Sequence, residues 1–127
     1  MDNHTHHEEI IQGFYKQFKT VFDNSGQAMY IYLDDVHKLC NKKFAELLGY
    51  DSAQEWASGD KSFTMEFVDE KSRHTLVNAY SAAMEKVIGS AFPVTWKTKT
   101  GKKVNSQVIL VPVEHEKHLL ALHFVQT

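Results

Sequence analysis

The chain has 127 residues, of which 43% are hydrophobic and 24% charged, which allows one domain with an ordinary core and leaves no room for two. The net charge is −2, and Arg73 is the single arginine among 14 basic residues, so nucleic acid is not expected as a partner. No apolar run approaches the ~20 residues of a membrane span, and the polar start does not resemble a signal peptide. We therefore expect a soluble, cytoplasmic protein without membrane contact. The lone Cys40 excludes an internal disulfide and a cysteine-based zinc site.

The first predicted element is an amphipathic helix. Hydrophobic residues recur at helical spacing from Ile10 to Phe22, and polar residues fill the other side. Residues 1–9 are polar and are expected to be frayed. The helix carries an aromatic stripe of Phe14, Phe18 and Phe22, which must be buried against another surface.

Two short strands are predicted next, over residues 27–33 and 36–40. The connection contains Asp34 and Asp35, and acidic residues are good turn formers. Neighbouring carboxylates in a tight turn diverge, so this pair is not expected to converge on a substrate.

A capped helix follows the strands directly. Asn41 can accept a hydrogen bond from the first free backbone amides, and Phe44, Leu47 and Leu48 lie on one helical face. Gly49 tolerates the left-handed conformation that ends a helix.

The remaining pattern predicts three more helical segments and three strands. The helical segments are a short helix at 53–56, a short segment at 63–68 and a long helix at about 69–88, ended by Gly89. The strands cover residues 91–98, 102–113 and 117–125.

Residues 41–50 resemble the pattern Asn-x-x-Phe-x-x-Leu-x-Gly-Tyr of PAS domains, and the whole element order is similar to the PAS fold. The turn at 98–103 also resembles the Lys-x-Gly hairpin common in that family. The resemblance implies an α+β fold with a five-stranded antiparallel sheet, helical segments on one face and an N-terminal amphipathic helix. It divides the chain into a tail and helix (1–22) and a PAS domain (23–127).

Alternation in the strands predicts two apolar sheet faces, and each needs a cover. The resemblance assigns the helix-facing, inner side to Met29, Ile31, Leu33, Val94, Trp96, Ser106, Val108, Leu110, Ala121 and His123. It leaves the outer side, with Tyr30, Tyr32, Ile109, Val111, Leu120, Leu122 and Phe124, to helix 10–22 of the same chain or of a partner.

A few polar groups in an apolar cavity are typical of a small-ligand site. We therefore predict a site for a small, largely apolar molecule formed by Met29, Ile31, Trp96, Ser106, Val108 and His123. The alternative is a closed core in which Ser106, Trp96 and His123 bond to backbone or to one another.

The outer face predicts a homodimer, as is common among PAS domains. Its expected interface consists of Phe14, Phe18, Phe22, Tyr30, Tyr32, Ile109 and Leu122.

The sequence leaves the cofactor unknown. His74 lies where haem-binding PAS domains supply the iron ligand, but its polar neighbours indicate a solvated helical turn. Residues 64–69 lack the cysteine that photosensing flavin domains carry in this segment. His4, His6 and His7 with Glu8 and Glu9 could bind a divalent metal, although such binding at a flexible terminus is usually adventitious. His115 and His118 are expected to be exposed loop residues.

Two functions remain open. The first is a stand-alone PAS sensor, which binds a ligand or a partner, is not an enzyme, and signals through dimer packing or a separate effector protein. The second is a cone-shaped α+β protein of the nuclear-transport-factor type, with His123 or His74 active in its cavity. That architecture places long helices before a strongly bent sheet, whereas here two strands precede the capped helix.

Overall fold

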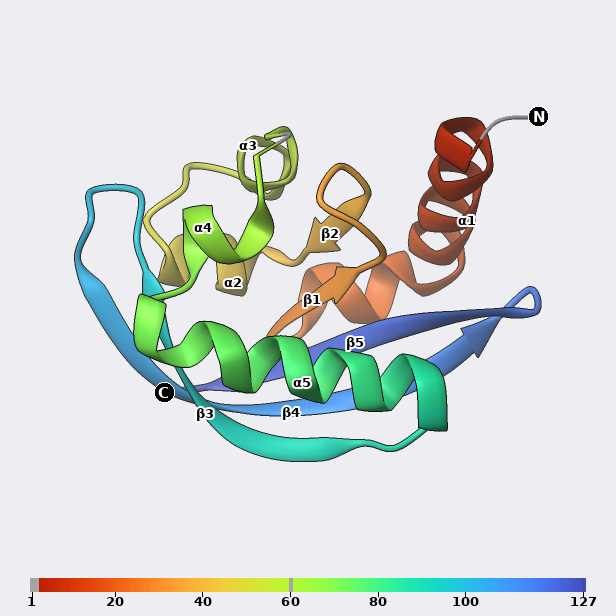
Figure 1. The fold of residues 1–127 in the computed structure, drawn as a ribbon. Helices are drawn as coiled ribbons and strands as arrows, with labels where there is room; N and C mark the ends of the chain where they lie inside the picture. Colours follow the sequence, from red (N-terminus) through yellow and green to blue (C-terminus); the bar gives the residue numbers. More distant parts are fainter. Residues whose placement is uncertain (1–2, 60) are drawn as a thin grey trace.

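A five-stranded antiparallel sheet forms the centre of the computed structural model, which describes residues 3–59 and 61–127. The strand order across the sheet is β2-β1-β5-β4-β3 (Figure 1). The strands are β1 (Ala28–Tyr32), β2 (Lys38–Cys40), β3 (Ser90–Lys97), β4 (Lys103–His115) and β5 (His118–Gln126). The helices are α1 (Asn3–Asn24), α2 (Lys42–Leu47), α3 (Ala53–Ala57), α4 (Phe63–Phe67) and α5 (Glu70–Lys86).

Helices α2 to α5 pack on one face of the sheet and α1 on the other (Figure 1). The predicted α+β fold is therefore confirmed. The alternative cone-shaped architecture is wrong, because β1 and β2 precede α2 to α5 and lie at one edge of an open sheet.

Asn41 starts α2 and also ties it to β1. Its Oδ1 accepts hydrogen bonds from the backbone amides of Phe44 and Met29, both at 3.1 Å. Its Nδ2 donates to the carbonyl of Gln27 at 2.6 Å. The helix is followed by Gly49 in the left-handed region, with φ 83°. The predicted cap therefore also fixes the position of the helix on the sheet.

The pairing of β1 with β5 decides which side chains of β1 face the helices. Tyr30 lies opposite His123, and Ile31 lies opposite Leu122. Directly opposed residues share a face of an antiparallel sheet. Tyr30 therefore lies on the inner face with His123, and Ile31 lies on the outer face.

The predicted faces of β1 are therefore wrong. Met29 and Ile31 pack on α1, whereas Tyr30 and Tyr32 lie in the inner core. Alternation shows which residues of a strand share a face, but both faces of β1 are apolar and only its register with β5 orients them. The faces predicted for β3, β4 and β5 agree with the structure.

Helix α1 covers the outer face of its own sheet. It buries Ile10, Ile11, Phe14 and Phe22 in a cluster with Met29, Ile31 and Leu120. The helix starts at Asn3, so the expectation of a frayed segment is wrong for residues 3–9, while residues 1–2 lie outside the described part of the chain. His115, expected to be exposed, is buried, with its ring 5.7 Å from that of Phe14.

Helix α5 ends at Lys86, two residues before the predicted end at residue 88. Val87 takes the left-handed conformation, with φ 55°, that the sequence pattern assigns to Gly89. In the part of the chain that the structure describes, no helix has both the length and the apolar character needed to cross a bilayer.

We expect replacement of Phe14 by Ala to lower the free energy of unfolding by about 3–5 kcal/mol, since the ring is 6% exposed and its loss leaves a cavity under α1. Val21→Ala on the same helix is the control, because Val21 is 66% exposed and should change stability by less than about 0.5 kcal/mol. Urea denaturation measures both. Equal effects of the two substitutions would contradict the packing of α1 on its own sheet.

Candidate functional site

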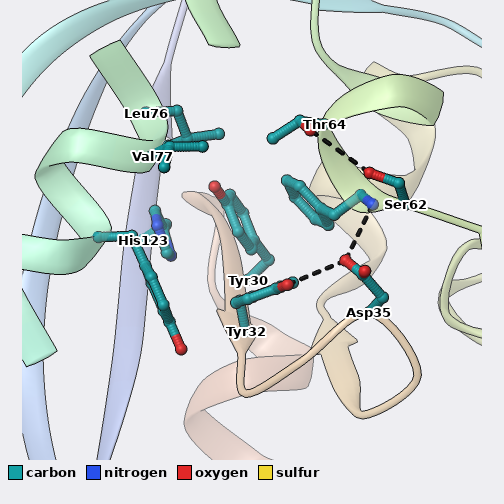
Figure 2. A pocket seen from close by; sticks show the side chains of 10 residues that line it. Tyr30, Tyr32, Asp35, Ser62, Thr64, Leu76, Val77 and His123 are labelled. Carbon is teal, nitrogen blue, oxygen red and sulfur yellow. Dashed lines mark hydrogen bonds between the residues drawn. The ribbon is translucent and has the colours of Figure 1, made fainter. Parts of the chain in front are cut away.

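A cavity of about 250 Å³ lies between β1, β5 and the helices α4 and α5 (Figure 2). Its walls are mainly aromatic and aliphatic, with several hydroxyl groups and one carboxylate. The lining residues are Tyr30, Tyr32, Asp35, Ser62, Phe63, Thr64, Leu76, Val77, Tyr80 and His123.

Tyr30 and His123 form the floor of the cavity. Their rings stack with centroids 4.0 Å apart and an interplanar angle of 9°. Both side chains are fully buried. Within the described chain, the Tyr30 hydroxyl has no hydrogen-bond partner. Burial raises the pKa of this hydroxyl well above its ordinary value, so it keeps its proton and can donate as well as accept.

His123 is uncharged. Burial lowers the pKa of its imidazole to about 3, although hydrogen bonds to the backbone of Ala121 and Tyr30 oppose this shift. Its Nδ1 lies 3.1 Å from the Ala121 carbonyl oxygen. At neutral pH the floor of the cavity therefore carries no charge.

Asp35 organises the polar side of the cavity. Its Oδ1 accepts hydrogen bonds from the Tyr32 hydroxyl at 2.9 Å and the Phe63 amide at 3.0 Å (Figure 2). These bonds join β1 to the start of α4. Across the cavity, the Tyr80 hydroxyl donates to the Leu33 carbonyl at 3.3 Å.

Lys38 fixes the loop that carries Asp35. Its ammonium group is buried and donates to the carbonyls of Asp35 at 2.6 Å and Gly59 at 3.0 Å. These bonds join the β1–β2 connection to the segment after α3. The cavity wall is thus positioned by hydrogen bonds as well as by packing.

Of the six residues predicted to bind a ligand, His123 lines the cavity. Met29 and Ile31 lie on the opposite face of β1. Trp96 donates from Nε1 to the Ser106 hydroxyl at 2.8 Å, and Ser106 donates to the Val94 carbonyl at 2.9 Å. These groups satisfy one another, as the alternative interpretation of the sequence expected.

Val108 is fully buried in the inner core and does not line the cavity. The sequence interpretation missed the cavity residues Tyr30, Tyr32, Asp35 and Tyr80. The two tyrosines at alternate positions of β1 are a usable signal, since each brings a hydroxyl to an apolar face, but the prediction places them on the wrong side of the sheet.

The candidate haem ligand His74 and the single cysteine lie elsewhere. His74 is on the exposed side of α5, with Nε2 3.0 Å from the Asn78 amide, and does not line the cavity. Cys40 is buried in β2, and burial raises the pKa of its thiol to about 12. Neither is placed to hold a group in this cavity.

Comparison with known protein families gives a match to a family model described as a PAS domain, over residues 16–81. This segment covers more than half of the chain and includes β1, β2, α2 to α4 and most of α5. The chain belongs to the PAS domain family. No curated protein matches it.

Solved PAS structures share the fold at low sequence identity. A PAS domain from Colwellia psychrerythraea is 20% identical, with a TM-score of 0.68 over 89% of this chain and 95% of that one. A PAS domain of a two-component sensor histidine kinase is 13% identical, with a TM-score of 0.65 over 91% and 96% of the two chains. A PAS domain of a LuxR-family transcriptional regulator from Burkholderia thailandensis, in complex with ethanol, is 17% identical, with a TM-score of 0.62 over 84% and 94%.

The buried His123 predicts a specific acid dependence of stability in this PAS domain. Between pH 6.5 and about 3 the unfolded chain binds a proton at this residue and the folded chain does not, so acid favours unfolding. This contribution should approach about 1.4 kcal/mol per pH unit below pH 6 and should be lost in His123→Gln. Denaturation between pH 4.5 and 7.5 measures it, with His74→Gln as an exposed control. Equal slopes for the wild type and His123→Gln would contradict a buried, neutral imidazole.

Proposed function

We propose that this PAS domain is a sensor whose cavity binds a small, neutral, largely apolar molecule with at least one hydrogen-bonding group. The observation that carries the proposal is the Tyr30 hydroxyl, which is buried next to the cavity that Tyr30 lines and lacks a partner among the described residues. A buried hydroxyl without a hydrogen bond costs about 1–3 kcal/mol. A ligand that bonds to it recovers this cost, which a purely apolar ligand cannot do.

The cavity supports a small ligand. Its volume of about 250 Å³ is below the ~300 Å³ at which sites for drug-sized molecules begin. His123 is neutral and Asp35 already accepts two hydrogen bonds, so the walls favour an uncharged molecule. The ethanol complex of the Burkholderia thailandensis PAS domain supports the same class of ligand.

The route from the cavity to an output passes through β1. Tyr30 and Tyr32 contact the cavity, while Met29 and Ile31 on the other face of the same strand pack on α1. A ligand that binds more tightly to one arrangement of β1 shifts the packing of α1. In this proposal α1 transmits the signal to a separate effector protein in the cytoplasm.

We propose binding rather than catalysis as the activity. The one histidine of the cavity has a pKa of about 3, which makes it a poor proton acceptor near neutral pH. A ligand screen that also scores chemical conversion by mass spectrometry tests this point. Conversion that is lost in His123→Gln would establish an enzyme instead.

The central prediction concerns Tyr30→Phe, which removes the hydroxyl and keeps the ring. In the ligand-free protein it should raise the free energy of unfolding by about 1–3 kcal/mol, because it removes an unsatisfied buried group. The same substitution should weaken binding of small alcohols, ketones and phenols, measured as the thermal shift produced by a panel that begins with ethanol.

Tyr80→Phe is the matched control for stability. It removes the same atom, but here the hydroxyl bonds to the Leu33 carbonyl, so stability should fall rather than rise. A loss of stability in Tyr30→Phe, or thermal shifts for the panel that equal those of the wild type, would refute the proposed site.

We further propose a homodimer through the outer side of the molecule. After α1 covers the outer face of the sheet, Phe18 remains 38% exposed and Ile109 46% exposed. Leu122 packs on the α1 cluster and is partly buried, so it contributes to the surface only at its margin. These exposed side chains are the part of the predicted interface that a second copy can contact.

Replacement of Phe18 or Ile109 by Glu should convert the dimer to a monomer, because a charge in an apolar interface loses its hydration. Sedimentation velocity measures the mass of each protein. Met65→Glu, at an exposed position of α4 on the other face of the sheet, is the control and should remain dimeric. A monomeric wild type, or dimeric Phe18→Glu and Ile109→Glu proteins, would contradict the proposal.

A further inference from the structure

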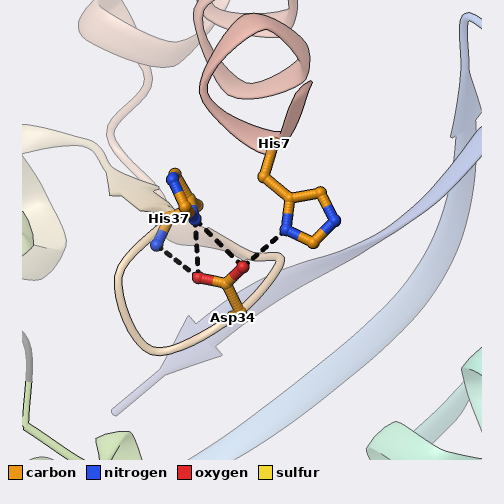
Figure 3. Close-up of side chains that lie close together, drawn as sticks. All are labelled: His7, Asp34 and His37. Atoms are coloured by element: carbon orange, nitrogen blue, oxygen red, sulfur yellow. Dashed lines mark hydrogen bonds and ion pairs between the residues drawn. The ribbon is translucent and has the colours of Figure 1, made fainter. Parts of the chain in front are cut away.

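Two histidines and an aspartate meet where α1 passes the β1–β2 connection. Figure 3 shows His7 of α1 and His37 on either side of the Asp34 carboxylate. His7 Nδ1 lies 2.6 Å from Asp34 Oδ2, and His37 Nδ1 lies 2.8 Å from Oδ1 and 2.9 Å from Oδ2. The three donor atoms of this cluster lie within 4.8 Å of one another.

The two oxygens of Asp34 have different surroundings. Oδ1 accepts hydrogen bonds from the backbone amides of Val36 at 2.9 Å and His37 at 2.7 Å, which fix the carboxylate in the connection. Oδ2 faces the Nδ1 atoms of both histidines. One carboxylate oxygen and two imidazole nitrogens therefore converge on one point.

We propose that His7, Asp34 and His37 form a binding site for a divalent transition-metal ion, best suited to Zn²⁺. Two imidazoles and one carboxylate form a common ligand set for this ion, with a fourth position left for water. In a tetrahedral site with bonds of ~2.1 Å, the ligand atoms are ~3.4 Å apart. To admit the ion, the distances of 2.6 and 2.9 Å between the nitrogens and Asp34 Oδ2 need to lengthen by less than ~1 Å, and the two nitrogens, within 4.8 Å of each other, need to lie ~3.4 Å apart.

The surroundings of the cluster support metal binding. The His37 side chain is 5% exposed, which holds its ring in one orientation. Its other nitrogen, Nε2, lies 3.8 Å from Glu8 Oε2, so a proton that moves from Nδ1 to Nε2 on metal binding faces a carboxylate. His7 and Asp34 are 29% and 37% exposed, so an ion and its water ligand can reach the site.

The site differs from adventitious binding by a histidine-rich terminus because two ligands come from a connection fixed by the sheet. His6, the neighbour of His7, turns instead to His118, with the two Nε2 atoms 2.7 Å apart. The side chain of His4 lies outside the described part of the chain. A bound ion joins the N-terminal half of α1 to the β1–β2 connection.

The test is titration of the full-length, metal-free protein with Zn²⁺ by calorimetry and with Co²⁺ by visible absorption. We expect one equivalent of metal and Co²⁺ bands of a tetrahedral site. His7→Gln and Asp34→Asn should weaken binding by at least ~10-fold, since even partners outside the ligand shell contribute that much. His6→Gln is the matched control on the same helix and should leave the affinity within about twofold, because His6 is not a ligand of the proposed site.

His37→Gln serves as a third ligand variant, interpreted only if circular dichroism shows native helix content, because this residue is buried. His7→Gln is the decisive variant, because His7 is partly exposed on the surface of α1 and its replacement should leave the fold intact. No metal uptake by the wild type would overturn the proposal. Equal losses in His6→Gln and His7→Gln, or unchanged binding in Asp34→Asn, would also overturn it and indicate binding by the terminal histidines alone.

Discussion

The antiparallel pairing of β1 with β5 is the constraint on which the rest of the molecule depends. It places Tyr30 opposite His123 and Ile31 opposite Leu122, and so gives one five-residue strand two buried faces. Side chains on the inner face form the floor of the cavity, and side chains on the outer face pack against α1. The start of the strand is fixed by the Asn41 side chain, which forms hydrogen bonds with the backbone of Met29 and Gln27. The side-chain amide of Gln27 also donates to the Val125 carbonyl at 2.8 Å. A shift of this register by one residue would exchange the two faces.

Two groups of polar side chains on the inner face have opposite energetic character. Trp96, Ser106 and the Val94 carbonyl form a chain of hydrogen bonds, which adds order to the core and leaves neither donor free for a ligand. The Tyr30 hydroxyl, beside them on the same face, is buried without a partner in the described chain. Polarity alone therefore did not distinguish a binding site from a core, whereas the count of satisfied hydrogen bonds does.

Local signals in the sequence were sufficient for most of the fold. Asn41, Ser52 and Asp69 each cap the helix predicted after them, because their side chains accept bonds from free backbone amides close by in sequence. The predicted end of α5 differs from the observed one because a β-branched residue, Val87, adopts a conformation usually taken by glycine. Val87 is 61% exposed and its backbone amide donates to the carbonyls of Ala82 and Ala83, so the backbone makes this helix end and no side-chain pattern in the sequence marks it.

The site was less predictable than the fold, because its residues come from segments far apart in sequence. Asp35, Ser62 and Tyr80 belong to a connection, the approach to α4 and the middle of α5. These three residues come together only through the packing of the helices on the sheet. His123 was found because a polar residue on an apolar strand face is visible in the sequence itself.

The β1–β2 connection places two adjacent residues, Asp34 and Asp35, in two different sites. The Asp34 carboxylate faces His7 and His37, and the Asp35 carboxylate accepts hydrogen bonds from the Tyr32 hydroxyl and the Phe63 amide. Because one peptide bond joins them, a change in the backbone that improves the geometry at one carboxylate also moves the other. Two ligands that each depend on this connection are then linked thermodynamically, and the factor by which the first alters the affinity of the second equals the factor in the reverse direction. In the proposed sensor, a single dipeptide thus combines two chemically different signals.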